Sequence, residues 1–80
     1  MADTKQFQAA PVPLLALQGG LATHGLTCDL SKPGEAKQGG WDCVWSYPTP
    51  ETIEVTLVSH PFLEASAFWS VIETALGKPI

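Results

Sequence analysis

The chain contains no arginine and only four lysines, against eight acidic residues, so its formal net charge is −4. Proteins that bind nucleic acids neutralise phosphate charges with clustered Lys and Arg, and Arg supplies the bidentate contact to guanine. We therefore expect no nucleic-acid partner. A basic protein partner would be attracted by the negative charge, which also suits an ordinary soluble domain.

Long apolar runs are missing as well. No run approaches the roughly 18 residues that a membrane-spanning helix requires. The N-terminal stretch has a single early lysine and is interrupted by Pro11, Pro13, Gly19 and Gly20, which is unlike a secretory signal. We therefore expect no membrane contact and a cytoplasmic location.

Cysteine and histidine are scarce, with only His24, Cys28, Cys43 and His60 present. Their spacing matches no Cys-x-x-Cys or His-x3-His pattern of zinc sites, so we expect no metal centre and no cofactor. A catalytic Cys–His pair would need a reactive thiolate. Both cysteines instead alternate with large apolar residues on a face that we expect to be buried. We therefore predict that the chain is not an enzyme.

The 80 residues are 45% hydrophobic and include three tryptophans, which indicates one folded domain with a small core. A domain of this size is marginal unless it packs efficiently, is cross-linked or associates. Residues 1–12 show no apolar period. We expect them to form a flexible N-terminal tail and residues 13–80 to form a single α+β domain.

The apolar residues of the second half change rhythm. They alternate over 41–47 and again over 53–59, and they then recur at helical spacing between Pro61 and Leu76. Periods of two and of 3.6 predict two strands followed by a helix, which Gly77 should end.

The first half predicts one helix and one further strand. A helix should begin at Pro13 and end at Gly25 in a Schellman motif, with Leu26 against Leu21. Gly19 and Gly20 would let this helix approach the sheet closely. Leu26 to Leu30 then reads as a strand, and residues 31–40 as a loop. The predicted fold is therefore helix, three-stranded antiparallel meander, helix (α-β-β-β-α), with both helices on one face of the sheet.

The predicted hairpins set the pairing of residues. If loop 31–40 closes symmetrically, Cys28 lies opposite Cys43. The pair could form a disulfide, or both could remain buried free thiols, as a reducing cytoplasm favours. In the second hairpin, a five-residue connection places Trp45 opposite Val55, and a three-residue turn is equally compatible with the apolar faces.

Two surfaces are candidate sites for a partner. The same pairing places Asp29 opposite Asp42, with Glu54 one strand further along. Opposed like charges are destabilising, so this acidic sheet face would be neutralised by loop lysines, by a cation or by a basic partner, unless it is merely solvated. The second surface is an apolar stripe at a spacing of four on the outer side of the C-terminal helix, formed by Leu63, Ala67 and Val71.

From these features we expect a small acidic, non-catalytic protein-interaction domain or an accessory domain that self-associates. The alternative is a small-ligand-binding module, in which Trp41, Trp45 and Trp69 form an aromatic cluster around the ligand.

Overall fold

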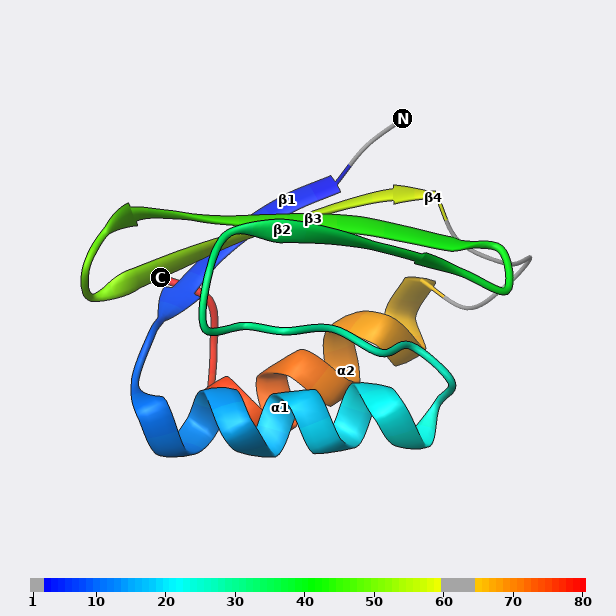
Figure 1. Ribbon diagram of the computed structural model, residues 1–80. Helices are drawn as coiled ribbons and strands as arrows, with labels where there is room; N and C mark the ends of the chain where they lie inside the picture. Colours follow the sequence, from blue (N-terminus) through cyan, green and yellow to red (C-terminus); the bar gives the residue numbers. More distant parts are fainter. Residues whose placement is uncertain (1–2, 60–64) are drawn as a thin grey trace.

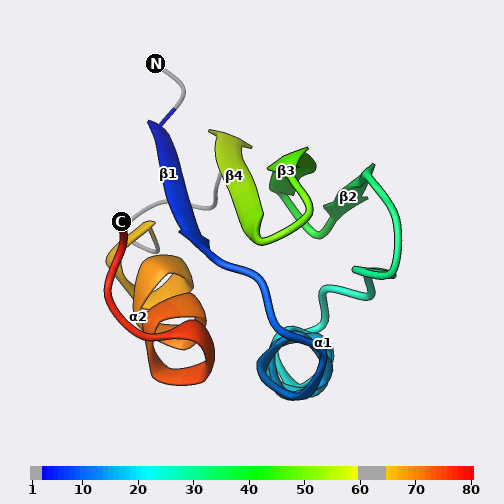
Figure 2. The same cartoon turned by 90° about the vertical axis from the view of Figure 1, so that its left-hand side faces the viewer.

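The computed structural model describes residues 3–59 and 65–80. Four antiparallel strands form one sheet in the order β1-β4-β3-β2, and both helices cover the same face of it (Figures 1 and 2). The elements are β1 (Asp3–Gln8), α1 (Pro11–Thr23), β2 (Gly34–Gln38), β3 (Trp41–Thr49), β4 (Thr52–Ser59) and α2 (Ala65–Leu76). The α+β class is confirmed, and so is the placement of both helices on one face. Three consecutive strands, β2, β3 and β4, form an antiparallel meander, but the predicted count of three strands and the predicted element order are wrong, because a fourth strand, β1, precedes α1.

Strand β1 occupies part of the segment that we expected to be a flexible tail, residues 1–12. It pairs antiparallel with β4, and Phe7 lies opposite Ile53 with no exposed surface. Helix α1 begins at Pro11, two residues before the predicted Pro13. The error has a clear cause: Phe7 is the single large apolar residue of an edge strand, so β1 shows no apolar alternation.

Strand β2 lies in the segment that we predicted to be a loop, residues 31–40. Gly39 and Gly40 have φ values of 56° and 88°, the left-handed conformation that a two-residue hairpin turn requires at both positions. This tight turn places Ala36, not Cys28, opposite Cys43. The predicted pairing of the two cysteines is therefore wrong.

Residues 26–33, which we call the strap, include the segment predicted to be the first strand of the meander. Leu26 and Leu30 are buried, as their alternation suggested. The strap belongs to no strand of the sheet. Its backbone N–H and C=O groups form hydrogen bonds with side chains of neighbouring elements instead. These bonds run from Thr27 N to Gln38 Oε1 (2.9 Å), from Leu30 N to Gln18 Oε1 (2.6 Å), from Trp45 Nε1 to Lys32 O (2.7 Å) and from Tyr47 Oη to Leu30 O.

The second hairpin keeps the register of the five-residue alternative. Trp45 lies opposite Val55, and Cys43 lies opposite Leu57. The register shifts on both sides of this central part, so the turn itself is shorter and joins Thr49 to Thr52. Such irregularities are typical of strongly twisted hairpins.

The helix ends follow the sequence signals. Leu26 N donates to Leu21 O over 2.9 Å and Gly25 N to Ala22 O over 3.0 Å, which is the predicted Schellman motif. Gly77, with φ 90°, ends α2 as predicted. The expected helix start at Pro61 lies outside the described residues.

The two helices pack against each other through Gly20. A Cβ atom at Gly20 would lie 3.2 Å from Val71 Cγ1, whereas one at Gly19 would meet nothing within 4 Å. The glycine pair was expected to bring α1 close to the sheet. The structure shows that Gly20 instead allows α1 to approach α2.

Large aromatic residues fill the space between the sheet and α2. Trp41 stacks on Phe68 with ring centroids 5.6 Å apart, and Phe68 meets Trp69 edge-on at 5.0 Å. The alternate β3 residues from Trp41 to Tyr47 turn toward the helices, with Cys43 and Trp45 buried and the two end residues half-buried. Neither described helix is long and apolar enough to cross a membrane.

Candidate functional site

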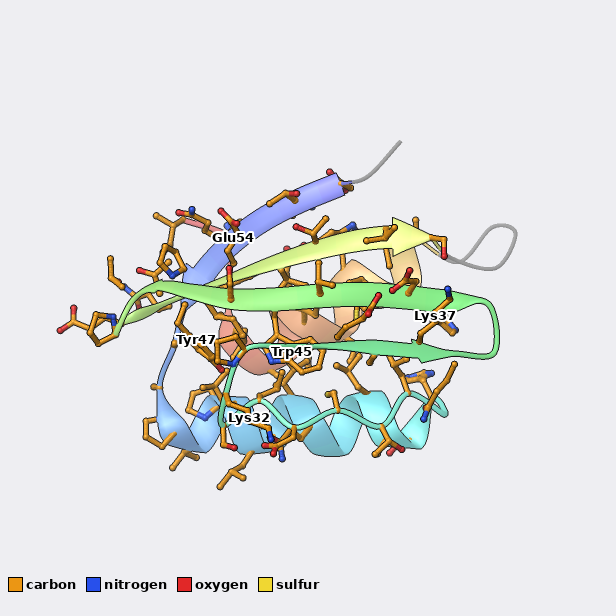
Figure 3. All side chains as sticks on the ribbon, turned by 45° about the horizontal axis from the view of Figure 1, so that its top comes forward. Lys32, Lys37, Trp45, Tyr47 and Glu54 are labelled. Atoms are coloured by element: carbon orange, nitrogen blue, oxygen red, sulfur yellow. The ribbon has the colours of Figure 1, made fainter. Side chains whose placement is uncertain are left out.

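The face of the sheet that points away from the helices carries no covering segment among the described residues (Figure 2). On its β1–β4 side, polar side chains satisfy one another. Thr4 Oγ1 and Thr56 Oγ1 are 2.9 Å apart, and Gln6 Nε2 donates to Glu54 Oε1 over 3.0 Å. Glu54, which points to this face in Figure 3, therefore already has a partner within the chain.

The β2–β3 side of the same face is electrostatically unbalanced. Lys37 lies opposite Asp42, and Glu35 lies two residues along β2 from Lys37. A hydrogen bond to Asp42, and then the negative charge of Asp42, raise the pKa of the exposed Glu35 carboxyl above its usual range. Asp42 itself is only 9% exposed, and its Oδ1 has no hydrogen-bond partner among the described residues. A buried carboxylate oxygen without a donor is costly, so this corner of the sheet would gain from an added cation.

The predicted acidic trio is only partly assembled. Asp42 and Glu54 both lie on the open face, but Glu54 is opposite Ser46 and not next to Asp42. Asp29 lies in the strap, where its carboxylate accepts hydrogen bonds from Ser31 Oγ at 2.6 Å and Ser31 N at 3.0 Å, and these bonds lower its pKa. The predicted opposition of Asp29 and Asp42 is therefore wrong.

Glu35 is the acidic neighbour of Asp42 that sequence reasoning missed. Its signal was the Gly39–Gly40 pair, a strong mark of a two-residue hairpin. Had that turn been recognised, the pairing of Lys37 with Asp42 would have followed, with Glu35 on the same face.

The outer edge of β2 is open. In a two-residue hairpin the residues that flank the turn, here Gln38 and Trp41, exchange backbone hydrogen bonds. Backbone direction alternates along a strand, so the N–H and C=O groups of Glu35 and Lys37 point away from β3. Among the described residues no backbone hydrogen bond outside the sheet ladder reaches either residue.

The opposite edge of the sheet is partly occupied. Gln6 O of β1 accepts a hydrogen bond from Ile80 N over 2.8 Å, so the C-terminal residue lies against that strand. The β2 edge, which ends the row of strands opposite β1 in Figure 2 with the strap running beside it, is therefore the more available of the two for another strand.

The predicted apolar stripe of the C-terminal helix is exposed at Ala67 and half-buried at Val71. Leu63 lies outside the described residues, Val71 packs toward Gly20 of α1, and Ala67 lines the same small hollow as Val71. The exposed side of α2 also carries Ser66, Ser70 and Thr74. A partner-binding role for Ala67 and Val71 stays a prediction, now with a different location.

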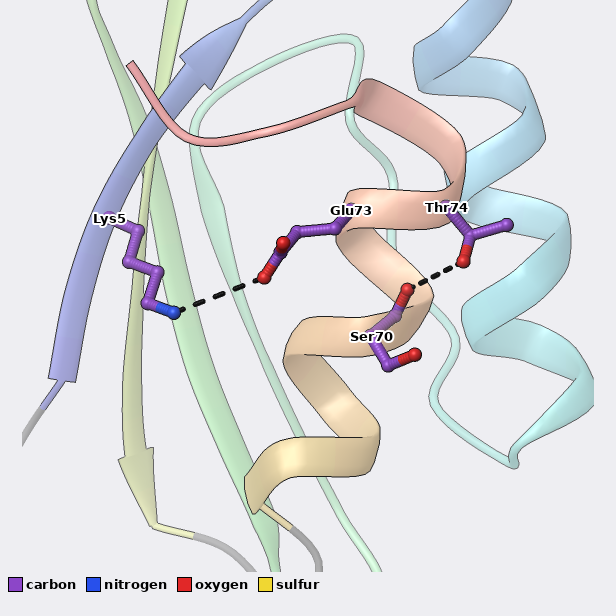
Figure 4. Close-up of polar contacts among 4 residues, drawn as sticks. All are labelled: Lys5, Ser70, Glu73 and Thr74. Carbon is purple, nitrogen blue, oxygen red and sulfur yellow. Dashed lines mark hydrogen bonds and ion pairs between the residues drawn. The ribbon is translucent and has the colours of Figure 1, made fainter.

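The surface between β1 and α2 is polar and internally paired (Figure 4). Lys5 Nζ lies 4.0 Å from Glu73 Oε2 and 4.8 Å from the ring centre of Trp69, and Thr74 Oγ1 donates to Ser70 O over 2.8 Å. A partly exposed ion pair of this kind contributes little stability. Lys5 and Glu73 match each other's charge, and Lys78 lines the hollow that they border.

The three tryptophans proposed as a ligand cluster are part of the packed interior. Trp45 and Trp69 are each only 6% exposed, and Trp45 is held by the strap carbonyl of Lys32 (Figure 3). The hollow beside Trp41 has a volume of about 80 Å³. Ligand pockets usually measure about 300–1,000 Å³. Trp41 therefore borders little room for a ligand, whereas Trp69 lines an open hollow of about 720 Å³ between β1 and α2.

The two cysteines are free, with Cys43 buried and Cys28 half-buried. Burial, and then the proximity of Cys28, raise the pKa of Cys43 to about 11. Burial also raises the pKa of Cys28, with Asp29 adding to the effect. Both groups are thiols at neutral pH and are therefore weak nucleophiles. No group of three or more potential metal ligands occurs among the described residues.

Comparison of the chain with protein-family models, with curated proteins and with solved structures finds no match.

Proposed function

We propose that this chain is a small, non-catalytic protein-interaction domain that accepts an extended segment of a partner at the free edge of β2. One observation carries the proposal: the outward backbone groups of Glu35 and Lys37 are open beside the carboxyl pair of Glu35 and Asp42, which Lys37 balances only in part. Strand addition at a sheet edge is a common mode of peptide recognition, in which backbone hydrogen bonds give affinity and side chains give specificity.

The chemistry of the edge defines the partner. An added strand would present alternate side chains on the open face, next to Glu35 and within reach of Asp42. The buried Asp42 Oδ1 and the raised pKa of Glu35 both favour a positive side chain at that point. The partner segment should therefore be extended and carry a lysine or arginine on the open face opposite Glu35.

The lack of catalysis is supported by the state of the nucleophiles. Both thiols are protonated at neutral pH, and the tryptophan cluster is packed as core. These features favour a role in binding over a role in covalent chemistry.

An NMR titration tests this function. The ¹⁵N-labelled chain is titrated with a capped peptide of alternating threonine and lysine, and with its counterpart in which glutamate replaces lysine. We expect the lysine peptide to shift the amide signals of residues 34–38, and the glutamate peptide to shift them much less.

Two variants at one position isolate the backbone contribution. Lys37→Pro removes an outward N–H without breaking the bonds to β3, because proline is tolerated where an edge strand faces solvent. Lys37→Thr removes the same charge but keeps the N–H. Binding that survives in Lys37→Thr and is lost in a folded Lys37→Pro supports strand addition. Equal binding by both variants contradicts it.

A further inference from the structure

Strand β2 has a charge pattern that is complementary to itself. Its five residues run Gly34, Glu35, Ala36, Lys37 and Gln38, so an acid and a base flank the buried Ala36 at equal distance. Two antiparallel copies of such a strand, related by a two-fold axis at Ala36, place each Glu35 opposite the second copy's Lys37. Both side chains stand on the open face of the sheet.

We infer that the partner of the β2 edge is a second copy of this chain, joined through antiparallel β2–β2 pairing centred on Ala36. This inference rests on the proposed function and names its partner. It would produce a continuous eight-stranded sheet with all four helices on one face. The contact is of the self-complementary kind that closes a two-fold dimer.

Hydrogen-bond geometry selects this register. Backbone groups of Glu35 and Lys37 point outward, so these residues must face each other as the bonded pairs of the new ladder. Ala36 then faces Ala36 of the second copy as the intervening non-bonded pair, in agreement with its inward backbone groups. The two Glu35–Lys37 pairs supply four backbone hydrogen bonds between the copies.

Charge excludes the neighbouring registers. A slip of two residues in one sense sets Glu35 against the second copy's Glu35, and a slip in the other sense sets Lys37 against the second copy's Lys37. Like charges directly opposite each other are destabilising. In the centred register, the second copy's Lys37 lies beside Glu35. Its positive charge stabilises the ionised form of the Glu35 carboxyl, which the nearby Asp42 destabilises. In the dimer each Glu35 therefore has a lysine of the second copy directly opposite it.

Concentration-dependent sedimentation tests the inference. A five-residue edge buries little surface, so we expect a weak dimer with a dissociation constant of about 0.1–1 mM. The weight-average mass should rise with protein concentration across that range. The amide hydrogens of Glu35 and Lys37 should become protected from exchange as the dimer forms. A chain that remains monomeric at several times this concentration overturns the inference.

Charge-swap variants make the test specific to the register. Glu35→Lys and Lys37→Glu each oppose like charges in the homodimer, so each variant alone should weaken association at least tenfold. Mixing the two variants in equal amounts pairs unlike charges at both positions and should restore the dimer. The double variant Glu35→Lys, Lys37→Glu should restore it within a single chain. Lys78→Glu changes the same charge on the far surface and serves as the matched control.

The outcomes separate this inference from the proposed function. The β2–β2 contact is overturned if the charge swaps at positions 35 and 37 leave the dissociation constant of the dimer unchanged. It is also overturned if Lys78→Glu weakens the dimer as much as they do. A monomeric chain that still binds the lysine peptide at residues 34–38 overturns the second copy as partner but leaves the proposed function standing. Failure of both experiments overturns both.

Discussion

Single residues decide the electrostatics of the open face. Glu35 and Asp42 are seven positions apart in sequence, on opposite sides of a tight turn, yet Asp42 lies close enough to raise the pKa of Glu35. Lys37 lies opposite Asp42 and moderates the effect. One lysine cannot balance two carboxylates, and this residual negative charge is the physical basis of the proposed function. The inferred self-pairing rests instead on the alternation of Glu35 and Lys37 along the open edge.

A pH titration of stability should reveal this pair. The raised pKa of Glu35 in the folded chain means that folding takes up a proton in the pH window just above the usual glutamate range. The free energy of unfolding should therefore fall as the pH rises through that window. Glu35→Gln should remove this part of the pH dependence. Urea unfolding at several pH values, in protein solutions dilute enough to remain monomeric, measures it.

The matched control for this experiment is Glu51→Gln, in the turn between β3 and β4. Glu51 is exposed and lies away from the β2 edge. A Glu35→Gln profile that parallels the wild type, with its slope unchanged over the same window, would contradict the assigned interaction with Asp42.

At the scale of elements, α1 packs on α2 at Gly20, whereas the neighbouring Gly19 takes no part in this contact. A Cβ atom at Gly19 has open space, whereas one at Gly20 would meet Val71 Cγ1 at 3.2 Å. The intrinsic helix propensity of glycine is the same at both positions. Any difference in stability between the two Gly→Ala variants therefore measures the contact between the helices.

Alanine substitutions at the two positions should therefore differ. Gly19→Ala should raise the free energy of unfolding by about 0.5–1 kcal/mol, because alanine loses less backbone entropy than glycine on folding. Gly20→Ala should gain less, since overpacking opposes the same entropic gain, and we expect it to be about 1 kcal/mol less stable than Gly19→Ala. Urea unfolding of both variants gives the comparison. Equal stability would show that the helices do not meet at Gly20.

Turn and cap signals predicted element ends well, while apolar alternation predicted strands less well. Gly25 and Gly77 end helices as expected, since few other residues adopt their positive φ without strain. The alternation of Leu26, Cys28 and Leu30 predicted burial correctly for the two leucines and strand pairing wrongly. Alternation reports which side chains turn inward, and the strap buries its leucines while side chains bind its backbone.

At the scale of the whole molecule, the N-terminal segment completes the core. Phe7 is fully buried and stacks against Trp69 with ring centroids 6.3 Å apart. Its neighbour Lys5 reaches Glu73 of α2 on the same side. Strand β1 therefore joins the sheet to α2, and a chain without it would expose the aromatic interior.

Phe7→Ala should accordingly cost about 3–5 kcal/mol of unfolding free energy, the usual cost of deleting a buried aromatic ring. That loss is a large share of the total stability of a small domain, typically about 5–15 kcal/mol. Gln8→Ala, at an exposed position of the same strand, is the control and should change stability little. Thermal and urea unfolding followed by tryptophan fluorescence measure both. A loss below about 1 kcal/mol for Phe7→Ala would show that β1 is a dispensable tail.

Local chemistry by itself determined much of this protein. The apolar periods from Trp41 onward fixed two antiparallel strands and a helix, and the glycines fixed where both helices end. The central register of β3 and β4 was one of two arrangements that the apolar faces allowed. These features depend on neighbours in sequence, whose side-chain spacing and backbone preferences can be read directly.

Only the tertiary structure decided the rest. An edge strand with one buried residue is stabilised by the strand and helix on which it packs. Strand β1 therefore has no apolar alternation in its own sequence from which it could be predicted. The choice between residues 26–30 and 34–38 as the partner of β3 was a competition between two segments for the same hydrogen bonds. The Gly39–Gly40 turn favours the closer segment, because a two-residue loop costs little entropy to close and both of its positions require positive φ. That competition placed Glu35 beside Asp42 and left the β2 edge open.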